Sequence, residues 1–358
     1  MKILIDNGLN KNGTGIAAYS DYLATALANL PDTEVSLENF TPRGGKIRRR
    51  LAYLHYLKSK AYRKKVGGFD VVHYTNYAMP KRLPAGVVSA VTVHDLTAFS
   101  HPDTLSRAYA AYNRKMVRRA VRSANIIFTV SAAMAEEIAA RFPATKEKIM
   151  TVYPGHYEVA TPNVLPEVYE NEALQGLEKG KFFLFIGTLE ARKNLTELVN
   201  AYALLLARCP AAKAYALVLA GRHGRGAAAL IDTVLDAPDE ADIRLPGYVC
   251  DSDRAKLLAE ATALVFPSVY EGFGSPQTEA MAAGLPMILS DIPTNREVSG
   301  ELALYYPVGD PDLLAKAMEL TLLGIHKADT AKYTARLSRF DWQQSAAEIR
   351  AAYEAHKK

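Results

Sequence analysis

Cysteine, tryptophan and long hydrophobic runs are scarce in this sequence. Its 358 residues include two cysteines and one tryptophan. Two cysteines supply neither a disulfide framework nor the ligand spacing of a zinc site, so we expect ordinary thiols at Cys209 and Cys250. No run reaches the roughly 18 apolar residues that a membrane-spanning helix needs, and the apolar stretch after Met1 ends too early for a signal peptide. These absences favour a cytoplasmic protein.

Acidic residues are missing from two basic segments of the first half, residues 43–65 and 107–122. The first segment holds ten lysines and arginines, interleaved with leucines and tyrosines at helical spacing. The second segment places Arg114, Arg118 and Arg122 on one helical face. This composition is typical of helices that lie on an anionic membrane surface. A solvated basic helix and a nucleic-acid contact are the alternatives. We expect the membrane surface as partner and no nucleic acid.

The length and the order of apolar segments predict two domains. A chain of 358 residues exceeds the size at which a single core stops growing. Short apolar strands alternate with helical patterns in both halves, which indicates two doubly wound α/β domains. We predict a first domain over residues 1–155, a linker over 156–179 and a second domain over 180–340. The terminal helix, residues 341–358, is expected to pack back on the first domain.

The stretch from Glu271 to Glu279 is the most informative part of the sequence. It lies between an apolar strand and a small-residue helix, and open α/β sheets bind ligands at such turns. Ser275 is the expected N-cap and Pro276 the first helical residue, so that the helix N-terminus faces an anion. Glu271 in the loop and Glu279 in the first helical turn place two carboxylates at one rim, where they could bond sugar hydroxyls. Alternatively, the stretch is a glycine-rich turn whose Glu279 complements the helix dipole.

Two other strand ends carry candidate site residues. Arg192 and Lys193 follow the strand 182–186, and two cations at that position could neutralise a diphosphate leaving group. A basic turn capped by Asn194 is the alternative. His94 follows the strand 86–93, where a side chain faces the ligand crevice of a doubly wound sheet. It could instead be a turn residue whose hydrogen bonds Asp95 completes.

Two short motifs argue against other chemistries. Asp251-Ser-Asp253 has the form of a metal-binding DxD motif, but it precedes an amphipathic run. We therefore expect Asp251 to be an N-cap, Asp253 to lie in the first helical turn, and no metal site. The stretch from Gly13 to Ala18 has the form of a dinucleotide fingerprint, yet it begins seven residues after the strand and lacks a matching ribose-binding acid. A nicotinamide dehydrogenase is thus disfavoured.

The segment from Pro267 to Pro286 resembles the signature of retaining glycosyltransferase family 4, in which two glutamates are separated by seven residues. Glu271 and Glu279 have that spacing. The stretch Gly187-Thr-Leu-Glu-Ala-Arg-Lys-Asn194 is similar to another motif of this family. The resemblance implies the GT-B fold, with two facing Rossmann-like doubly wound domains and a cleft between them. It also implies a nucleotide sugar as substrate, without a metal ion or other cofactor.

The resemblance implies a role for each candidate residue. Glu271 and His94 would be the catalytic residues and would contact the transferred sugar from opposite domains. Glu279 would bind the ribose, and Lys193 with Arg192 would bind the diphosphate. The other implied donor-binding residues are Gly15, Thr188, Arg222, Gly272, Phe273, Gly274 and Ser275. Thr188 stands where the family commonly has an arginine, so either Arg192 takes over that role or the diphosphate is held by one fewer charge.

The 187–194 motif looks like that of a subgroup in which GDP-mannose users are frequent. It implies transfer of mannose to a lipid-linked or polysaccharide acceptor by a protein that is peripheral on the inner membrane face. A glycosyltransferase of the same fold that uses a UDP-linked sugar is the main alternative. A nucleotide-sugar epimerase and a non-catalytic protein that binds sugar nucleotides are alternatives from other classes.

Overall fold

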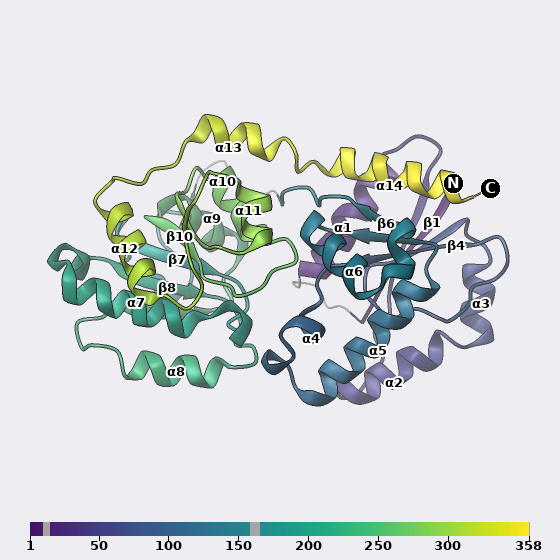
Figure 1. Cartoon of the computed structure of the whole chain (residues 1–358), viewed down its shortest axis with the longest axis horizontal. Coiled ribbons are helices and arrows are strands. Elements are labelled where there is room, and N and C mark those ends of the chain that lie inside the picture. The colour runs from purple at the N-terminus through teal and green to yellow at the C-terminus, as the bar shows by residue number, and fades with distance from the viewer. Residues whose placement is uncertain (10–14, 158–164, 358) are drawn as a thin grey trace. The chain divides into compact units, whose positions relative to one another are not determined.

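The computed structural model describes residues 1–9, 15–157 and 165–357 (Figure 1). The chain divides into two compact units. Unit 1 comprises Met1–Pro102, Ser106–Gly155 and Phe340–Lys358, and unit 2 comprises His156–Arg339 with Asp103–Leu105. Gly13 and Thr14, the first two residues of the possible dinucleotide fingerprint, lie outside the described residues, as does part of the segment 156–179.

Unit 1 contains a parallel six-stranded sheet with the order β2-β1-β3-β4-β5-β6. Its strands are β1 (Lys2–Gly8), β2 (Glu34–Asn39), β3 (Val71–Tyr74), β4 (Val88–Val93), β5 (Ile126–Thr129) and β6 (Ile149–Thr151). The central strands β3, β4 and β5 are buried along their whole length, which explains their nearly continuous apolar sequence. The direction of strand addition reverses between β1 and β3.

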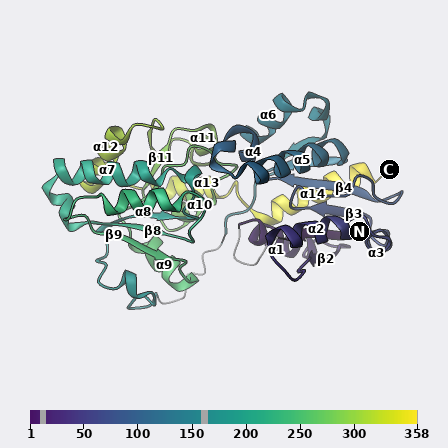
Figure 2. The ribbon, with the colours of Figure 1, turned by 90° about the horizontal axis from the view of Figure 1, so that it is seen from below.

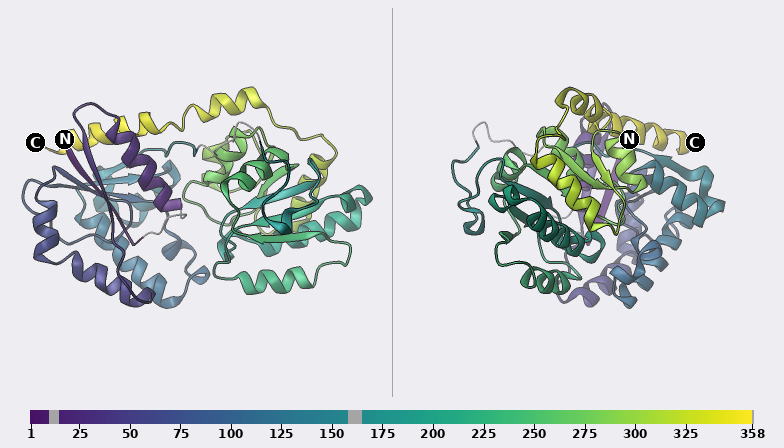
Figure 3. Two further views of the ribbon diagram at one scale, coloured as in Figure 1. Left: turned by 180° about the vertical axis from the view of Figure 1, so that it is seen from behind. Right: turned by 60° about the vertical axis from the view of Figure 1, so that its left-hand side comes forward.

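The helical segments of unit 1 are α1 (Gly15–Ala28), α2 (Lys46–Tyr56), α3 (Lys60–Val66), α4 (Thr97–Ser100), α5 (Arg107–Ser123), α6 (Ala132–Arg141), the 3₁₀ segment η2 (Pro143–Lys148) and α14 (Trp342–His356). The 3₁₀ segment η1 (Pro102–Thr104) crosses the boundary, with Asp103 and Thr104 in unit 2. The terminal helix α14 packs against α1 within this unit (Figure 3). The Tyr353 hydroxyl lies 2.6 Å from Nδ1 of the buried His73. Burial lowers the pKa of His73 to about 3, so this hydrogen bond joins two neutral groups.

Unit 2 contains a second parallel six-stranded sheet, with the order β12-β11-β10-β7-β8-β9. Its strands are β7 (Phe182–Ile186), β8 (Ala216–Ala220), β9 (Ile243–Gly247), β10 (Ala263–Phe266), β11 (Met287–Ser290) and β12 (Leu304–Tyr306). The direction of strand addition reverses between β7 and β10. The doubly wound α/β fold predicted from the sequence is therefore confirmed for both units.

Helices cover both faces of the second sheet (Figure 2). The helical segments are η3 (Glu172–Leu174), η4 (Ala191–Lys193), α7 (Leu195–Arg208), η5 (Pro210–Ala214), α8 (Ala227–Leu235), α9 (Asp251–Glu260), α10 (Ser275–Ala282), α11 (Pro293–Ser299), α12 (Pro311–Leu322) and α13 (Thr330–Leu337). Helix α7 packs against α8 and α12, whereas α10 packs against α11 and α13. The loops that carry the candidate site follow the carboxyl ends of the strands.

The Asp251-Ser-Asp253 motif begins helix α9, but Asp251 is not its N-cap. Cys250 occupies the N-cap position, in an extended conformation, and both aspartates lie in the first helical turn. The buried Asp253 carboxylate accepts hydrogen bonds from the backbone N–H groups of Glu170 and Asn171, at 2.8 and 3.0 Å. Asp253 therefore connects the start of α9, through these two hydrogen bonds, to residues 170–171, which lie in the predicted linker.

The basic segment 43–65 forms two helices instead of one, because Ser59 caps α3 by accepting a hydrogen bond from the Tyr62 backbone N–H. Most of its aromatic and leucine side chains face inward, and the Tyr53 and Tyr62 hydroxyls both donate to the buried Asp6 carboxylate. Two apolar side chains of α2 are exposed instead: Ile47 has 74% and Leu51 has 63% of its surface exposed. Among the described helices, none combines the length and apolar character needed to cross a bilayer.

Candidate active site

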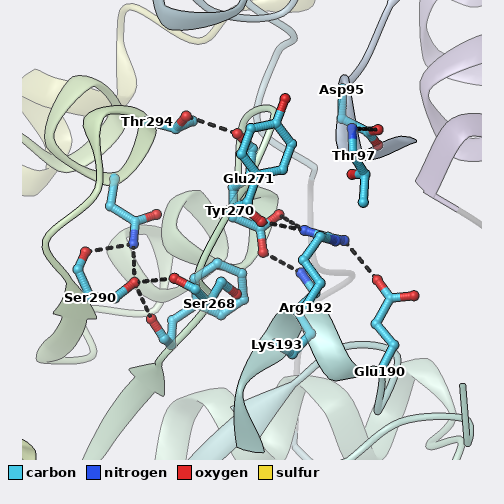
Figure 4. A network of polar contacts seen from close by, with 12 residues as sticks. Asp95, Thr97, Glu190, Arg192, Lys193, Ser268, Tyr270, Glu271, Ser290 and Thr294 are labelled. Atoms are coloured by element: carbon cyan, nitrogen blue, oxygen red, sulfur yellow. Dashed lines mark hydrogen bonds and ion pairs between the residues drawn. The ribbon is translucent and has the colours of Figure 1, made fainter. Parts of the chain in front are cut away.

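The candidate site of unit 2 lies where the strand order of the second sheet reverses, at the carboxyl ends of β7 and β10. Ligands of open α/β sheets bind at this position. The loop after β7 carries Arg192 and Lys193, and the loop after β10 carries Glu271 (Figure 4). Lys193 Nζ lies 2.5 Å from Glu271 Oε1, and Arg192 Nη1 lies 2.8 Å from Glu271 Oε2. Two cations therefore share one carboxylate, and we call these three residues the ion cluster.

Further contacts fix both cations. Arg192 donates through Nη1 to the Tyr270 carbonyl oxygen at 2.7 Å and through Nη2 to Glu190 at 2.8 Å. Lys193 is buried, and its ammonium group lies 4.7 Å from the centroid of the Phe266 ring. Because several partners hold each side chain, the cations are preorganised.

The electrostatics of the ion cluster are set by burial and by the two cations. Burial acts to raise the pKa of Glu271, but Arg192 and Lys193 outweigh it and lower the pKa to about 2. Burial and the neighbouring Arg192 lower the pKa of Lys193, while Glu271 opposes that shift. Glu271 is therefore a carboxylate at neutral pH and cannot act as a general acid there.

Hydrogen bonds from the neighbouring strand and helix hold the loop that carries Glu271. The Thr294 hydroxyl, on α11, donates to the Glu271 carbonyl oxygen at 2.8 Å. The Ser290 hydroxyl, at the end of β11, donates to the Ser268 carbonyl oxygen at 2.5 Å. The Asn295 amide donates in turn to the Ser290 carbonyl oxygen at 2.9 Å. The loop is thus tied to β11 and α11 (Figure 4).

Helix α10 begins one residue earlier than the sequence predicted, and Ser275 is not its N-cap. The N-cap is Gly274, which has φ +86°, and Ser275 is the first helical residue with Pro276 next to it. A Cβ atom at Gly274 would lie 2.3 Å from Gln277 Nε2, so both conformation and space require glycine there. Because Ser275 opens the helix, Glu279 falls in its second turn and not in the first.

Glu279 is paired with an arginine that the sequence analysis missed. Arg254 Nε donates to Glu279 Oε2 at 2.9 Å, and Arg254 Nη2 contacts Oε1 at 2.5 Å. Arg254 lies in the first turn of α9, directly after the Asp251-Ser-Asp253 motif. A positive charge in the first turn of a helix is disfavoured by the helix dipole, and this was the one sequence feature that could have identified Arg254 as a site residue.

The loops after β7 and β8 approach each other closely. The Leu189 backbone N–H donates to the Arg222 carbonyl oxygen at 2.9 Å. A Cβ atom at Gly221 would lie 1.7 Å from the Gly187 carbonyl oxygen, which requires glycine at that position. Thr188 is exposed on this loop pair, and the Arg222 guanidinium lies 4.5 Å from the centroid of the Tyr248 ring. Gly272 and Phe273 are buried in the loop after β10.

His94 and Gly15 belong to unit 1. His94 follows β4 and is half-buried, with Nε2 3.1 Å from the Thr75 carbonyl oxygen and its ring 4.8 Å from that of Tyr19 in an edge-to-face arrangement. Burial lowers the pKa of His94 to about 4, although Asp95 and the bond to Thr75 oppose the shift. Its imidazole is therefore neutral at physiological pH. Gly15 is the first residue of α1.

Both halves of the chain match models of glycosyltransferase families. Residues 15–156 match the model "Glycosyltransferase Family 4", and residues 170–337 match "Glycosyl transferases group 1". The chain is 31% identical over 290 residues to O-antigen chain mannosyltransferase B of Escherichia coli, which covers 79% of this chain and 74% of that protein. It is 26% identical over 320 residues to O-antigen chain mannosyltransferase RfbU of Salmonella typhimurium, covering 83% of this chain and 84% of that protein.

A solved structure with lower sequence identity supports the fold. Sucrose-phosphate synthase from Thermosynechococcus elongatus superposes with a TM-score of 0.75 at 19% identity, covering 99% of this chain and 98% of that one. The fold is GT-B. The chain belongs to glycosyltransferase family 4 and is a glycosyltransferase, as the resemblance predicted.

Replacing Glu271 by glutamine tests the ion cluster. The change leaves the buried Lys193 and the partly buried Arg192 without their shared counter-charge, so we expect the free energy of unfolding to fall by about 3–5 kcal/mol at pH 7. The folded-state pKa of about 2 lies below the ordinary value of 4.5, so Glu271 stabilises the fold above pH 4.5 and this contribution is lost as the pH falls toward 2. Urea unfolding at several pH values measures both effects.

Glu190→Gln is the matched control, because Glu190 pairs with the same Arg192 but has 31% of its side chain exposed. We expect a loss below about 1 kcal/mol for this variant. Equal losses in the two variants, or a Glu271→Gln deficit that persists undiminished near pH 2, would contradict the proposed electrostatics.

Proposed function

We propose that the chain is a retaining, metal-independent glycosyltransferase that moves mannose from GDP-mannose to a lipid-linked or polysaccharide acceptor. The observation that carries the proposal is the ion cluster, in which the buried Lys193 and the partly buried Arg192 lie at the carboxyl edge of the second sheet. Transfer breaks the bond between the anomeric carbon and the diphosphate oxygen and forms a bond to the acceptor oxygen. The diphosphate that leaves is an anion, and the cations lie where they could neutralise it.

The diphosphate competes with Glu271 for the two cations. When phosphate oxygens bind Lys193 and Arg192, the Glu271 carboxylate gives up its hydrogen bonds and becomes available to the hydroxyls of the donor sugar. The start of α10 favours the same anion through its backbone N–H groups. A neutral His94 can contribute one hydrogen bond to the sugar without adding charge to an oxocarbenium-like centre. Glu279 would bind the ribose.

The proposed donor and acceptor are inferred from the descriptions of similar proteins. The proteins from Escherichia coli and Salmonella typhimurium are both described as O-antigen chain mannosyltransferases, which favours a mannosyl donor and a polysaccharide acceptor. Gln277 does not contribute to donor choice in this proposal, because its buried amide is bonded to Asn295 and Ser299. A UDP-linked sugar is the donor that the experiment below must distinguish.

The basic surface of unit 1 supports action at an anionic membrane. Exposed basic side chains on α2 and α5 include Arg48, Arg118 and Arg122. Arg50 of α2 lies 4.5 Å from the centroid of the Tyr109 ring on α5, so the two helices are packed together. The exposed Ile47 lies beside these charges, and apolar side chains among cations are what an interfacial helix needs.

A thermal-shift panel tests the donor. Wild type and Lys193→Ala are measured with GDP-mannose, UDP-glucose, UDP-N-acetylglucosamine and NAD. A donor at about 100 times its dissociation constant stabilises the fold by about 2.7 kcal/mol. We expect GDP-mannose to stabilise the wild type and Lys193→Ala to lose most of that ligand-induced shift. Lys181→Ala, which removes an exposed lysine paired with Glu178, should respond as the wild type does.

Stabilisation by UDP-sugars alone would show that the donor is a UDP-linked sugar and not GDP-mannose. Stabilisation by NAD alone would contradict the proposed function. Incubation of the purified protein with GDP-mannose and no acceptor separates the other classes. An epimerase converts the donor sugar under these conditions, whereas the proposed transferase leaves it epimerically unchanged.

Vesicle sedimentation tests the membrane surface. The double variant Ile47→Ser, Leu51→Ser should lose at least about half of its binding to phosphatidylglycerol-containing vesicles, because burial of each apolar side chain contributes about 1.5–3 kcal/mol. The matched control is Leu323→Ser with Ile325→Ser, which removes two exposed apolar side chains from unit 2. Equal binding by the two double variants, or no preference of the wild type for anionic over neutral vesicles, would contradict the membrane proposal.

A further inference from the structure

The contact between Arg254 and Glu279 differs from an ordinary surface ion pair in its burial. Glu279 has 2% of its side chain exposed, whereas Arg254 has 34% exposed. Arg296 and Asp291 of the same unit form an ion pair of similar geometry, with contacts of 2.7 and 2.9 Å, but 40% and 44% of those side chains are exposed. A buried carboxylate requires a partner, and a half-exposed one does not. Arg254 therefore supplies the counter-charge of a buried carboxylate.

Arg254 uses only part of the hydrogen-bonding capacity of Glu279. An ionised carboxylate has about four acceptor sites on its two oxygens. Within the described part of the chain, the hydrogen bonds to the Glu279 carboxylate come from Arg254, through Nε and Nη2. Because Nη2 contacts both oxygens and Nε contacts Oε2, at least one acceptor site is left, on Oε1 of a carboxylate whose orientation the planar guanidinium group fixes. A free acceptor site on a rigidly held carboxylate can accept from the adjacent hydroxyls of a ribose.

We propose that Arg254 is a positioning residue for the donor nucleotide, which holds the Glu279 carboxylate in the orientation that accepts hydrogen bonds from the ribose 2′ and 3′ hydroxyls. The inference rests on the proposed function, since it takes a nucleoside diphosphate sugar as the ligand. Arg254 itself touches neither the sugar nor the diphosphate in this arrangement. It acts through Glu279.

A purely structural role makes a different prediction. If Arg254 only balanced a buried charge, its loss would weaken the binding of every nucleotide by the same factor. If it positions Glu279 for the ribose, its loss weakens only those nucleotides that carry the hydroxyls. The ratio of affinities for ribose and deoxyribose nucleotides therefore separates the two roles, and this ratio does not depend on the stability of the variant.

Titration calorimetry with GDP, 2′-deoxy-GDP and 3′-deoxy-GDP measures that ratio. We expect the wild type to bind GDP about tenfold more tightly than either analogue, since a hydrogen bond to a charged acceptor is lost with each hydroxyl. In Arg254→Gln the affinity for GDP should fall about tenfold, while the affinities for the deoxy analogues change by less than about threefold. Arg296→Gln is the matched control and should keep the wild-type ratio.

Arg254→Lys keeps the charge but cannot form the bidentate contact, so it protects the test against a variant that fails to fold. We expect this variant to lose at least about half of the tenfold discrimination while circular dichroism shows a folded protein. An unchanged ratio in Arg254→Lys and Arg254→Gln, with GDP and its analogues weakened alike, would overturn the inference and leave the proposed function intact.

The corresponding UDP and 2′-deoxy-UDP titrations are run in parallel. If the enzyme uses a UDP-linked sugar, the same affinity ratio, measured with these nucleotides, tests the role of Arg254. A wild type that binds neither GDP nor UDP would overturn the proposed function and the inference together. A wild type that binds both ribose and deoxyribose forms with equal affinity would overturn the role of Glu279, and with it that of Arg254.

Discussion

The pairing of two cations, one buried and one partly buried, with a single buried carboxylate is the constraint on which the rest of unit 2 depends. Lys193 and Arg192 come from the loop after β7, and Glu271 comes from the loop after β10. Their charges are stable away from water only if they remain together, so the two loops must end within hydrogen-bond distance of each other. The parallel sheet supplies this arrangement, because β7 and β10 are neighbours and their carboxyl ends lie at one edge. Bonds from Thr294 to Glu271 and from Ser290 to Ser268 then hold the second loop in place.

The same constraint explains how the site can bind an anion without a metal ion in the proposed mechanism. The cations are already oriented by Tyr270, Glu190 and Phe266, so an arriving diphosphate does not have to order them. It has only to displace Glu271. Within the ion cluster the two cations lower the pKa of Glu271 to about 2, so the group that the diphosphate would displace is a carboxylate whose lone pairs can accept from sugar hydroxyls. Glu279 is likewise a buried carboxylate paired with a cation, which is Arg254.

The sequence predicted the parts of this structure that depend on local pattern. The nearly continuous apolar strands indicated two doubly wound sheets, and the strand ends identified Lys193, Arg192, Glu271 and Glu279 as site candidates. The contact between Glu271 and the two cations could not be predicted, since Lys193 and Arg192 lie 78 and 79 positions before it in the sequence. Arg254 was missed for the same reason: its partner lies 25 positions away on another helix. Ser275 was wrongly assigned as the N-cap, because a serine before a proline matches the usual pattern and the left-handed conformation of Gly274 does not show in the sequence.

The central claim is that the donor diphosphate takes Lys193 and Arg192 from Glu271, and a crystal structure of the wild type with bound GDP tests it most directly. The account predicts phosphate oxygens about 2.7–2.9 Å from the Lys193 ammonium and the Arg192 guanidinium groups. The Lys193 Nζ to Glu271 Oε1 distance should then lengthen from 2.5 Å to beyond hydrogen-bond range. GDP bound elsewhere on the protein, or bound nearby with that ion pair still intact, would contradict the account.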